Sequence, residues 1–161
     1  IDLTLGYTTG GFSISVTDYW FNGGPGYFHY GSHNTNHTFE AQIGYDFGPL
    51  TLNWYTNFAG TDGVNNEGDR AYSSYISATV PFTLAGLEWT AEIGATPWAT
   101  DFYNYSEDPV CNGSNGFAVC DISLGAAKEI RITDSFSVPA FAKVTVNPRT
   151  EGAYFVFGLS F

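Results

Sequence analysis

The chain has 161 residues, and its 16 acidic side chains against 5 basic ones give a net charge of −11. So few cations exclude a nucleic-acid-binding protein, because almost nothing is available to neutralise phosphates. Hydrophobic residues at 43% and aromatic residues at 18% exclude a disordered chain, and the length predicts a single domain over residues 1–161. Charged residues make up 13%, about half the usual share of a soluble domain. The composition therefore favours a surface that does not face water.

No run of about 18 apolar residues occurs, which excludes a transmembrane helix. Instead, apolar and polar residues alternate along most of the chain, which predicts half-buried β-strands. In the third strand, for example, Phe39, Ala41 and Ile43 alternate with Glu40 and Gln42. The predicted strands cover residues 1–7, 12–20, 39–46, 50–58, 72–82, 87–96, 121–130, 137–147 and 153–161.

The connections between these strands alternate in length. Tight turns near residues 9, 48, 85 and 134 interleave with polar loops at 21–35, 60–70 and 98–118. Transmembrane β-barrels of the outer membrane have short periplasmic turns and longer extracellular loops in this order. Aromatic residues near the strand ends are expected to form the interfacial girdles of such a barrel; they include Tyr7, Trp20, Phe47, Phe58, Tyr72 and Phe82. The pattern predicts an all-β chain folded as an antiparallel, transmembrane, up-and-down β-barrel.

The last nine residues, AYFVFGLSF, place Phe155, Phe157, Leu159 and Phe161 on one face of a strand. This ending resembles the C-terminal strand of bacterial outer-membrane barrels, which the barrel-assembly machinery reads as a signal. Bacterial barrels have an even number of strands with both termini on the periplasmic side. Because the first and ninth predicted strands run the same way, we expect an odd number of strands before Ile1, giving ten or twelve in all. The alternative is a complete eight-stranded barrel in which one of the nine segments is not a membrane strand.

Four stretches carry a closer resemblance: GFSISVTDYW at 11–20, HTFEA at 37–41, GYDF at 44–47 and AYFVFGLSF at 153–161. They resemble a family of uncharacterised outer-membrane barrels of Bacteroidota-type bacteria, similar to the porins named TorF-like. The resemblance covers most of the chain. It implies a barrel fold, a location in the bacterial outer membrane and a pore, and it carries no established catalytic residues.

The polar sides of the strands are rich in acids, with Lys143 as the base assigned among them. In a water-filled lumen these carboxylates would attract cations, so we expect a small cation-preferring pore for ions or polar solutes. The alternative is a barrel filled by side chains, with the acids bonded to groups such as Arg131, Tyr55, Tyr75 and Tyr154, acting as a structural or binding subunit. A soluble ligand-binding barrel is a third possibility. The predicted lumen acids are Asp2, Glu40, Asp46, Glu88, Glu92, Asp121 and Glu129.

The loops contain the remaining candidate sites. His29, His33 and His37 fall within nine residues and are weak candidates for a transition-metal site, with a simple polar loop as the default. Cys111 and Cys120 are expected to form a disulfide that pins the third loop. Oxygen ligands for calcium crowd the second loop, although their spacing does not match an EF-hand, and a solvated acidic loop is the default; they are Asp62, Asn65, Glu67 and Asp69.

An enzyme would need a nucleophile and a base held together. Ser32, His33 and Asp18 form the one such set, and nothing in the sequence orients them. We therefore expect no enzymatic activity and no cofactor. The expected partners are outer-membrane lipid, the barrel-assembly machinery and a protein that contacts the extracellular loops.

Overall fold

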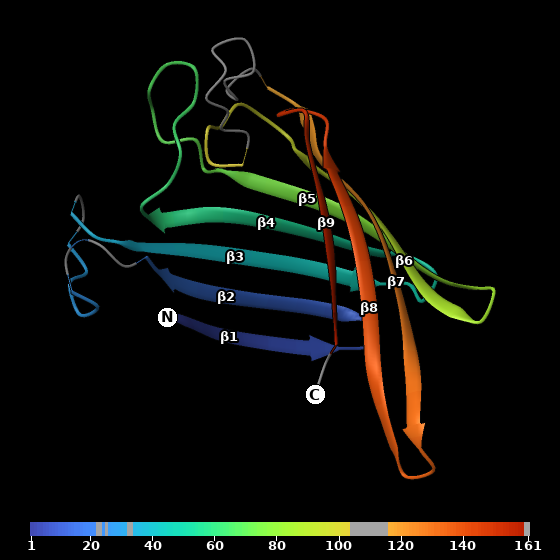
Figure 1. Cartoon of the computed structure of the whole chain (residues 1–161). Helices are drawn as coiled ribbons and strands as arrows, with labels where there is room; N and C mark the ends of the chain where they lie inside the picture. The colour runs from blue at the N-terminus through green and yellow to red at the C-terminus, as the bar shows by residue number, and fades with distance from the viewer. Residues whose placement is uncertain (22–23, 25, 32–33, 104–115, 160–161) are drawn as a thin grey trace.

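The computed structural model describes residues 1–21, 24, 26–31, 34–103 and 116–159. Nine antiparallel strands form one sheet in which every strand pairs with its neighbours in the chain, so the order is β1 to β9 (Figure 1). The strands are β1 (Asp2–Thr9), β2 (Phe12–Trp20), β3 (His37–Asp46), β4 (Thr51–Gly60), β5 (Ser74–Leu84), β6 (Leu87–Thr96), β7 (Ala118–Thr133), β8 (Phe136–Asn147) and β9 (Gly152–Leu159). The predicted number and up-and-down order of strands are confirmed.

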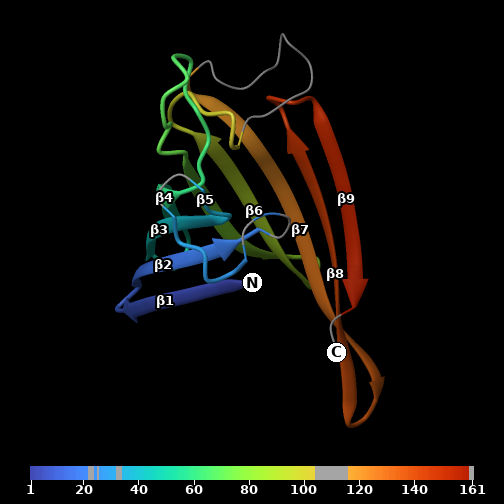
Figure 2. The same cartoon turned by 90° about the vertical axis from the view of Figure 1, so that its left-hand side faces the viewer.

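The sheet is strongly curved but not closed. Figure 2 shows it as a trough, with β1 and β9 along its two rims. β1 pairs only with β2, and β9 pairs only with β8. We call the hollow side of the trough the inner face and the other side the outer face. All long loops lie at one end of the strands, the loop end, and the tight turns that follow β1, β3, β5 and β7 lie at the other, the turn end.

The burial of side chains is inverted relative to a water-soluble protein. Among the described residues, only Ala71, Ala95, Cys120 and Val138 are buried hydrophobic residues. The buried polar residues are Thr17, His37, Thr38, Asn57, Ser73, Ser74, Ser77, Thr96, Thr100 and Ser123. Large apolar side chains are exposed along the sheet; Leu5 is 82% exposed and Phe157 is 77% exposed. Their positions alternate with the polar ones, so the outer face is apolar and the inner face is polar.

Some strand boundaries differ from the prediction. Alternation predicts a fifth strand from residue 72, but Tyr72 has a φ of 48° and β5 begins at Ser74. A left-handed backbone interrupts the extended conformation at Tyr72, and alternation carries no signal for it. The third strand begins earlier than expected, at His37, and the seventh is longer, spanning Ala118–Thr133. Register shifts interrupt the pairing of β3 with β4 at Phe39/Glu40 and of β6 with β7 at Gly94/Ala95.

The β7–β8 hairpin projects beyond its neighbours at the turn end (Figure 1). Along β7, the pairing with β6 ends at Ala127, which lies opposite Glu88. Along β8, the pairing with β9 ends at Ala140, which lies opposite Leu159. The tip therefore has no strand neighbour among the described residues. Within the tip, Arg131 forms an ion pair with Asp134 of the turn.

Candidate functional site

The inner face carries a ladder of hydrogen bonds between side chains of adjacent strands. Thr4 of β1 bonds to Thr17 of β2 at 2.9 Å between their hydroxyl oxygens. One level away, the Ser15 hydroxyl donates to Gln42 Oε1 at 3.1 Å, and Gln42 Nε2 donates to Asn53 Oδ1 at 3.3 Å. These groups face one another because directly opposite residues of antiparallel strands share a face. The ladder gives the inner face a continuous polar lining over β1 to β4.

Glu40 is the centre of the largest polar cluster on this face. The Tyr19 hydroxyl donates to Glu40 Oε1 at 3.1 Å, and the Tyr103 hydroxyl donates to Glu40 Oε2 at 3.0 Å. The ring of Tyr103 also packs 5.6 Å from that of Tyr75, which lies 6.0 Å from that of Tyr55. Glu40 is thus a carboxylate with a hydroxyl donor on each oxygen, beside a row of tyrosine rings. Burial, followed by the charge of Glu40 and its hydrogen bond, raises the pKa of Tyr103 above the ordinary 10.0.

The seven predicted lumen acids all fall on the inner face by register, but they do not form one ring. Asp2, Glu40 and Asp121 lie toward the loop end, since Asp2 pairs with Tyr19 near the end of β2, and Asp121 pairs with Gly94 near the end of β6. Asp46, Glu88 and Glu129 lie toward the turn end, and Glu92 lies between the two groups. Sequence alternation determines the face on which a side chain lies. Its position between the loop end and the turn end depends on the register of the sheet.

The contacts of these acids also differ. Glu92 accepts a hydrogen bond from Thr79 at 3.1 Å, and Asp121 accepts one from Ser123 at 2.5 Å. Asp46 accepts the backbone N–H of Gly48 at 2.7 Å and so stabilises the turn after β3. Among the described residues, none of these acids forms an ion pair with a basic side chain. Lys143 lies on the same face opposite Gly125, without an ion pair to a described acid.

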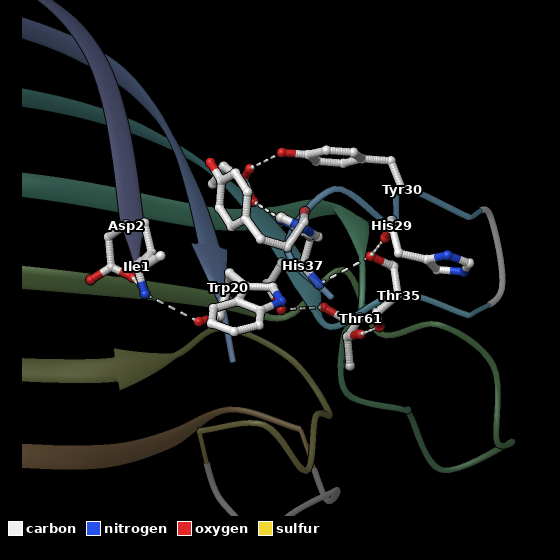
Figure 3. A network of polar contacts seen from close by, with 11 residues as sticks. Ile1, Asp2, Trp20, His29, Tyr30, Thr35, His37 and Thr61 are labelled. Atoms are coloured by element: carbon white, nitrogen blue, oxygen red, sulfur yellow. Dashed lines mark hydrogen bonds and ion pairs between the residues drawn. The ribbon is translucent and has the colours of Figure 1, made fainter. Parts of the chain in front are cut away.

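A second polar cluster lies on the outer face at the loop end, beneath the first loop (Figure 3). His37 is completely buried; its Nδ1 lies 2.6 Å from Asp18 Oδ1, and its Nε2 lies 2.6 Å from the carbonyl oxygen of Tyr27. Its ring stacks on Tyr30 at 4.1 Å between centroids, and the Tyr30 hydroxyl donates to Asp18 Oδ2 at 3.3 Å. A carbonyl oxygen only accepts, so the contact with Tyr27 is a hydrogen bond donated by His37 Nε2, while Nδ1 shares the contact with Asp18.

This arrangement bears on the predicted transition-metal site of His29, His33 and His37. Both ring nitrogens of His37 are in contact with protein oxygens, so neither is free to bind a metal as His37 is placed. Asp18, which the sequence grouped with Ser32 and His33 as an enzymatic set, is bonded to His37 instead. His33 and Ser32 lie outside the described residues. Within the described part of the chain no group of three or more His, Cys, Asp or Glu side chains gathers as a metal site.

In the second loop, Asp62 and Asn65 accept hydrogen bonds from the backbone of the loop. Asp62 Oδ1 accepts the N–H of Gly63 at 2.8 Å and a bond from Asn57 Nδ2 at 3.3 Å, while Asp62 Oδ2 accepts the N–H of Ser73 at 3.2 Å. Asn65 Oδ1 accepts two further N–H groups, those of Glu67 and Asp69. Two of the four candidate calcium ligands, Asp62 and Asn65, therefore organise turns, which is the usual role of Asp and Asn in loops.

The predicted disulfide and the C-terminal signal fall partly outside the described residues. Cys120 is a buried free cysteine whose Sγ lies 3.9 Å from the carbonyl oxygen of Gly94. Cys111 and Phe161 are not among the described residues. No disulfide of Cys120 is seen among the residues that the structure describes, so the disulfide stays a prediction, as does the assembly signal.

Sequence reasoning missed two partners that build these clusters. Tyr103 lies in a polar loop with no periodic pattern, so nothing in the sequence pointed to its contact with Glu40. Asp18 did leave a signal, because alternation from Phe12, Ile14 and Val16 places this acid on an apolar face. A charged residue there needs a buried partner, and His37 provides it.

The described residues contain no helix long and apolar enough to cross a membrane. Comparison of the chain with protein-family models, curated proteins and solved structures gives no match.

Proposed function

We propose that this chain forms an antiparallel transmembrane β-barrel of a bacterial outer membrane, of the Gram-negative, Bacteroidota type, and that it conducts small cations and polar solutes. The observation that carries the proposal is the inverted burial, with polar residues buried and large apolar residues exposed on the outer face. In water such a surface is strongly unfavourable, at about 25 cal/mol per Å² of apolar area. Outer-membrane lipid on the outer face removes that cost, as it does for barrels with an apolar band.

The proposed cation preference follows from the charges of the inner face. Its seven acids stand against Lys143 and Arg131, and Arg131 is already paired with Asp134 in the tip of the β7–β8 hairpin. Glu88 and Glu129 form no ion pair with a described residue. Carboxylates in a narrow aqueous path concentrate cations and repel anions. The inner face therefore favours cations over anions at neutral pH.

Closure of the sheet is part of the proposal. β1 and β9 run in the same direction because nine strands alternate. An antiparallel barrel therefore needs an odd number of further strands between them, which gives ten or twelve. We assign the expected contact with the barrel-assembly machinery to the C-terminal residues that follow β9, which include Phe161.

Conductance in a planar bilayer with a salt gradient tests this function. We expect steady channels whose reversal potential indicates cation preference, and a smaller preference when Glu88 and Glu92 are replaced by Gln. Glu67→Gln is the matched control, because it removes an acid from the exposed second loop. An unchanged reversal potential in the Glu88→Gln/Glu92→Gln variant would refute the role of the inner acids.

A filled barrel that acts as a structural or binding subunit is the second candidate. The contact of Tyr103 with Glu40 favours it, because it places a loop side chain over the inner face. The ladder over β1 to β4 adds to this, because inner side chains there bond to one another. A folded, inserted protein that carries no current would support this candidate. The search for its function would then move to partners of the loops.

A further inference from the structure

The third loop enters the inner face at a defined point. Trp98 lies on the outer side of the sheet at the loop end. Its ring is 5.7 Å from that of Trp54, and its Nε1 donates to the carbonyl of Ala71 at 2.8 Å. Five residues later, the Tyr103 hydroxyl reaches Glu40 on the inner face. The segment 98–103 thus passes over the loop end of the sheet, from the outer side to the inner face.

This crossing segment is fastened to the second loop. The hydroxyls of Thr100 and Ser73 lie 2.6 Å apart, and both side chains are fully buried. Asp101 exchanges two hydrogen bonds with Val64, one from the Val64 N–H to Asp101 Oδ1 at 2.8 Å and one from the Asp101 N–H to the Val64 carbonyl at 3.2 Å. Figure 2 shows the second loop, in green, beside the start of the third, in yellow. Tyr103 therefore extends from a fixed base.

At its inner end, Tyr103 contacts two strands directly and a third through Tyr75. It bonds to Glu40 of β3, and its ring packs on Tyr75 of β5, which in turn contacts Tyr55 of β4. Its hydroxyl occupies one oxygen of Glu40, while Tyr19 occupies the other. A solute passing this level meets an aromatic ring and a carboxylate with both oxygens already bonded.

We propose that Tyr103, carried inward by the segment 98–103 and held by Glu40, forms the narrowest part of the lumen and limits access of cations to the Glu40 carboxylate. This inference rests on the proposed pore. It assigns two separable effects to one side chain. The ring sets the size limit, and the hydroxyl covers one oxygen of Glu40.

Two substitutions separate these effects. Tyr103→Ala removes the ring and is expected to raise single-channel conductance and to admit larger polyethylene glycols in polymer-exclusion measurements. Tyr103→Phe keeps the ring, so it is expected to leave the size limit unchanged and to shift the reversal potential toward stronger cation preference. That shift should vanish in the Glu40→Gln background, which a general structural effect would not produce.

Tyr154 offers the matched control. It lies on the inner face of β9 opposite Thr145 and is 62% exposed. Tyr154→Ala and Tyr154→Phe remove the same atoms away from Glu40, and we expect both to leave conductance, size limit and selectivity unchanged. Heat-modifiable migration on a gel checks that each variant is folded, and if Tyr103→Ala does not fold, the selectivity shift of Tyr103→Phe decides.

The outcomes separate this inference from the proposed pore. If the unmodified chain conducts and neither Tyr103 variant differs from its Tyr154 counterpart, the inference is wrong and the pore stands. If the unmodified chain is silent but Tyr103→Ala conducts, Tyr103 closes the lumen, which supports the inference and refutes an open pore. If both are silent while folded and inserted, both proposals are wrong.

Discussion

The two faces of the sheet handle polar groups differently where β3 begins. On the outer face, His37 and Asp18 are enclosed by the rings of the first loop, and His37 has no exposed surface. On the inner face, three residues further along, Glu40 is only partly buried and is bonded to neutral hydroxyls. Charged groups on an apolar face must be paired and shielded, whereas a polar face leaves them accessible. The same strand thus holds an enclosed His–Asp pair on one side and, in our proposal, a carboxylate of the conducting path on the other.

The outer cluster should show the largest effect on stability. His37→Ala leaves Asp18 buried without its main partner, which costs about 3–5 kcal/mol by analogy with broken buried ion pairs. We expect this loss in denaturant unfolding of the protein folded into lipid vesicles. His29→Ala, in the first loop and outside the pair, should change the free energy of unfolding by less than about 0.5 kcal/mol. Equal effects of the two variants would mean that the contact between His37 and Asp18 does not stabilise the fold.

A charge placed on either face of β6 tests the same difference between the faces. Ile93 is 49% exposed on the outer face, so Ile93→Lys should destabilise the inserted protein by about 2–4 kcal/mol, as a lysine does on the lipid face of a barrel. Thr90→Lys adds the same charge to the inner face of the same strand and should cost little. Unfolding from vesicles measures both. A small effect at Ile93 would argue against lipid on the outer face.

Replacing glycines of the inner face by alanine tests how tightly the side chains there are packed. A Cβ at Gly94 would overlap the hydroxyl end of Tyr75, whereas a Cβ at Gly125 would meet its nearest atom at 3.8 Å. Gly94→Ala should therefore destabilise by about 1–3 kcal/mol, as overpacking does, and Gly125→Ala should be nearly neutral. If the two alanines behave alike in unfolding measurements, Tyr75 does not lie over Gly94.

The smallest expected effect is the titration of Tyr103. Because its pKa is raised in the folded state, the folded protein holds this proton more tightly than the unfolded chain. The stabilising contribution is fully present below the ordinary pKa of 10.0 and is lost as the pH rises above that value. Unfolding measured across this range should lose less stability in Tyr103→Phe than in the unmodified chain, because the variant lacks the titrating group. An identical pH dependence would contradict the burial of Tyr103 beside Glu40.

The alternation of apolar and polar residues is sufficient to predict the nine strands and the face on which most side chains lie. Both depend on the two-residue period of a strand, which is a local property. For this reason the sequence alone assigns Glu40, Glu88 and Glu92 to the polar face.

The heights of the acids, the start of β5 at Ser74 and the partners of the two clusters depend on the tertiary structure. His37 and Asp18 are 19 residues apart, and Tyr103 and Glu40 are 63 residues apart. These contacts depend on whether a loop folds over the outer face or into the inner one, and no local pattern encodes that choice. The direction of each loop follows from which face offers it partners once the sheet has formed.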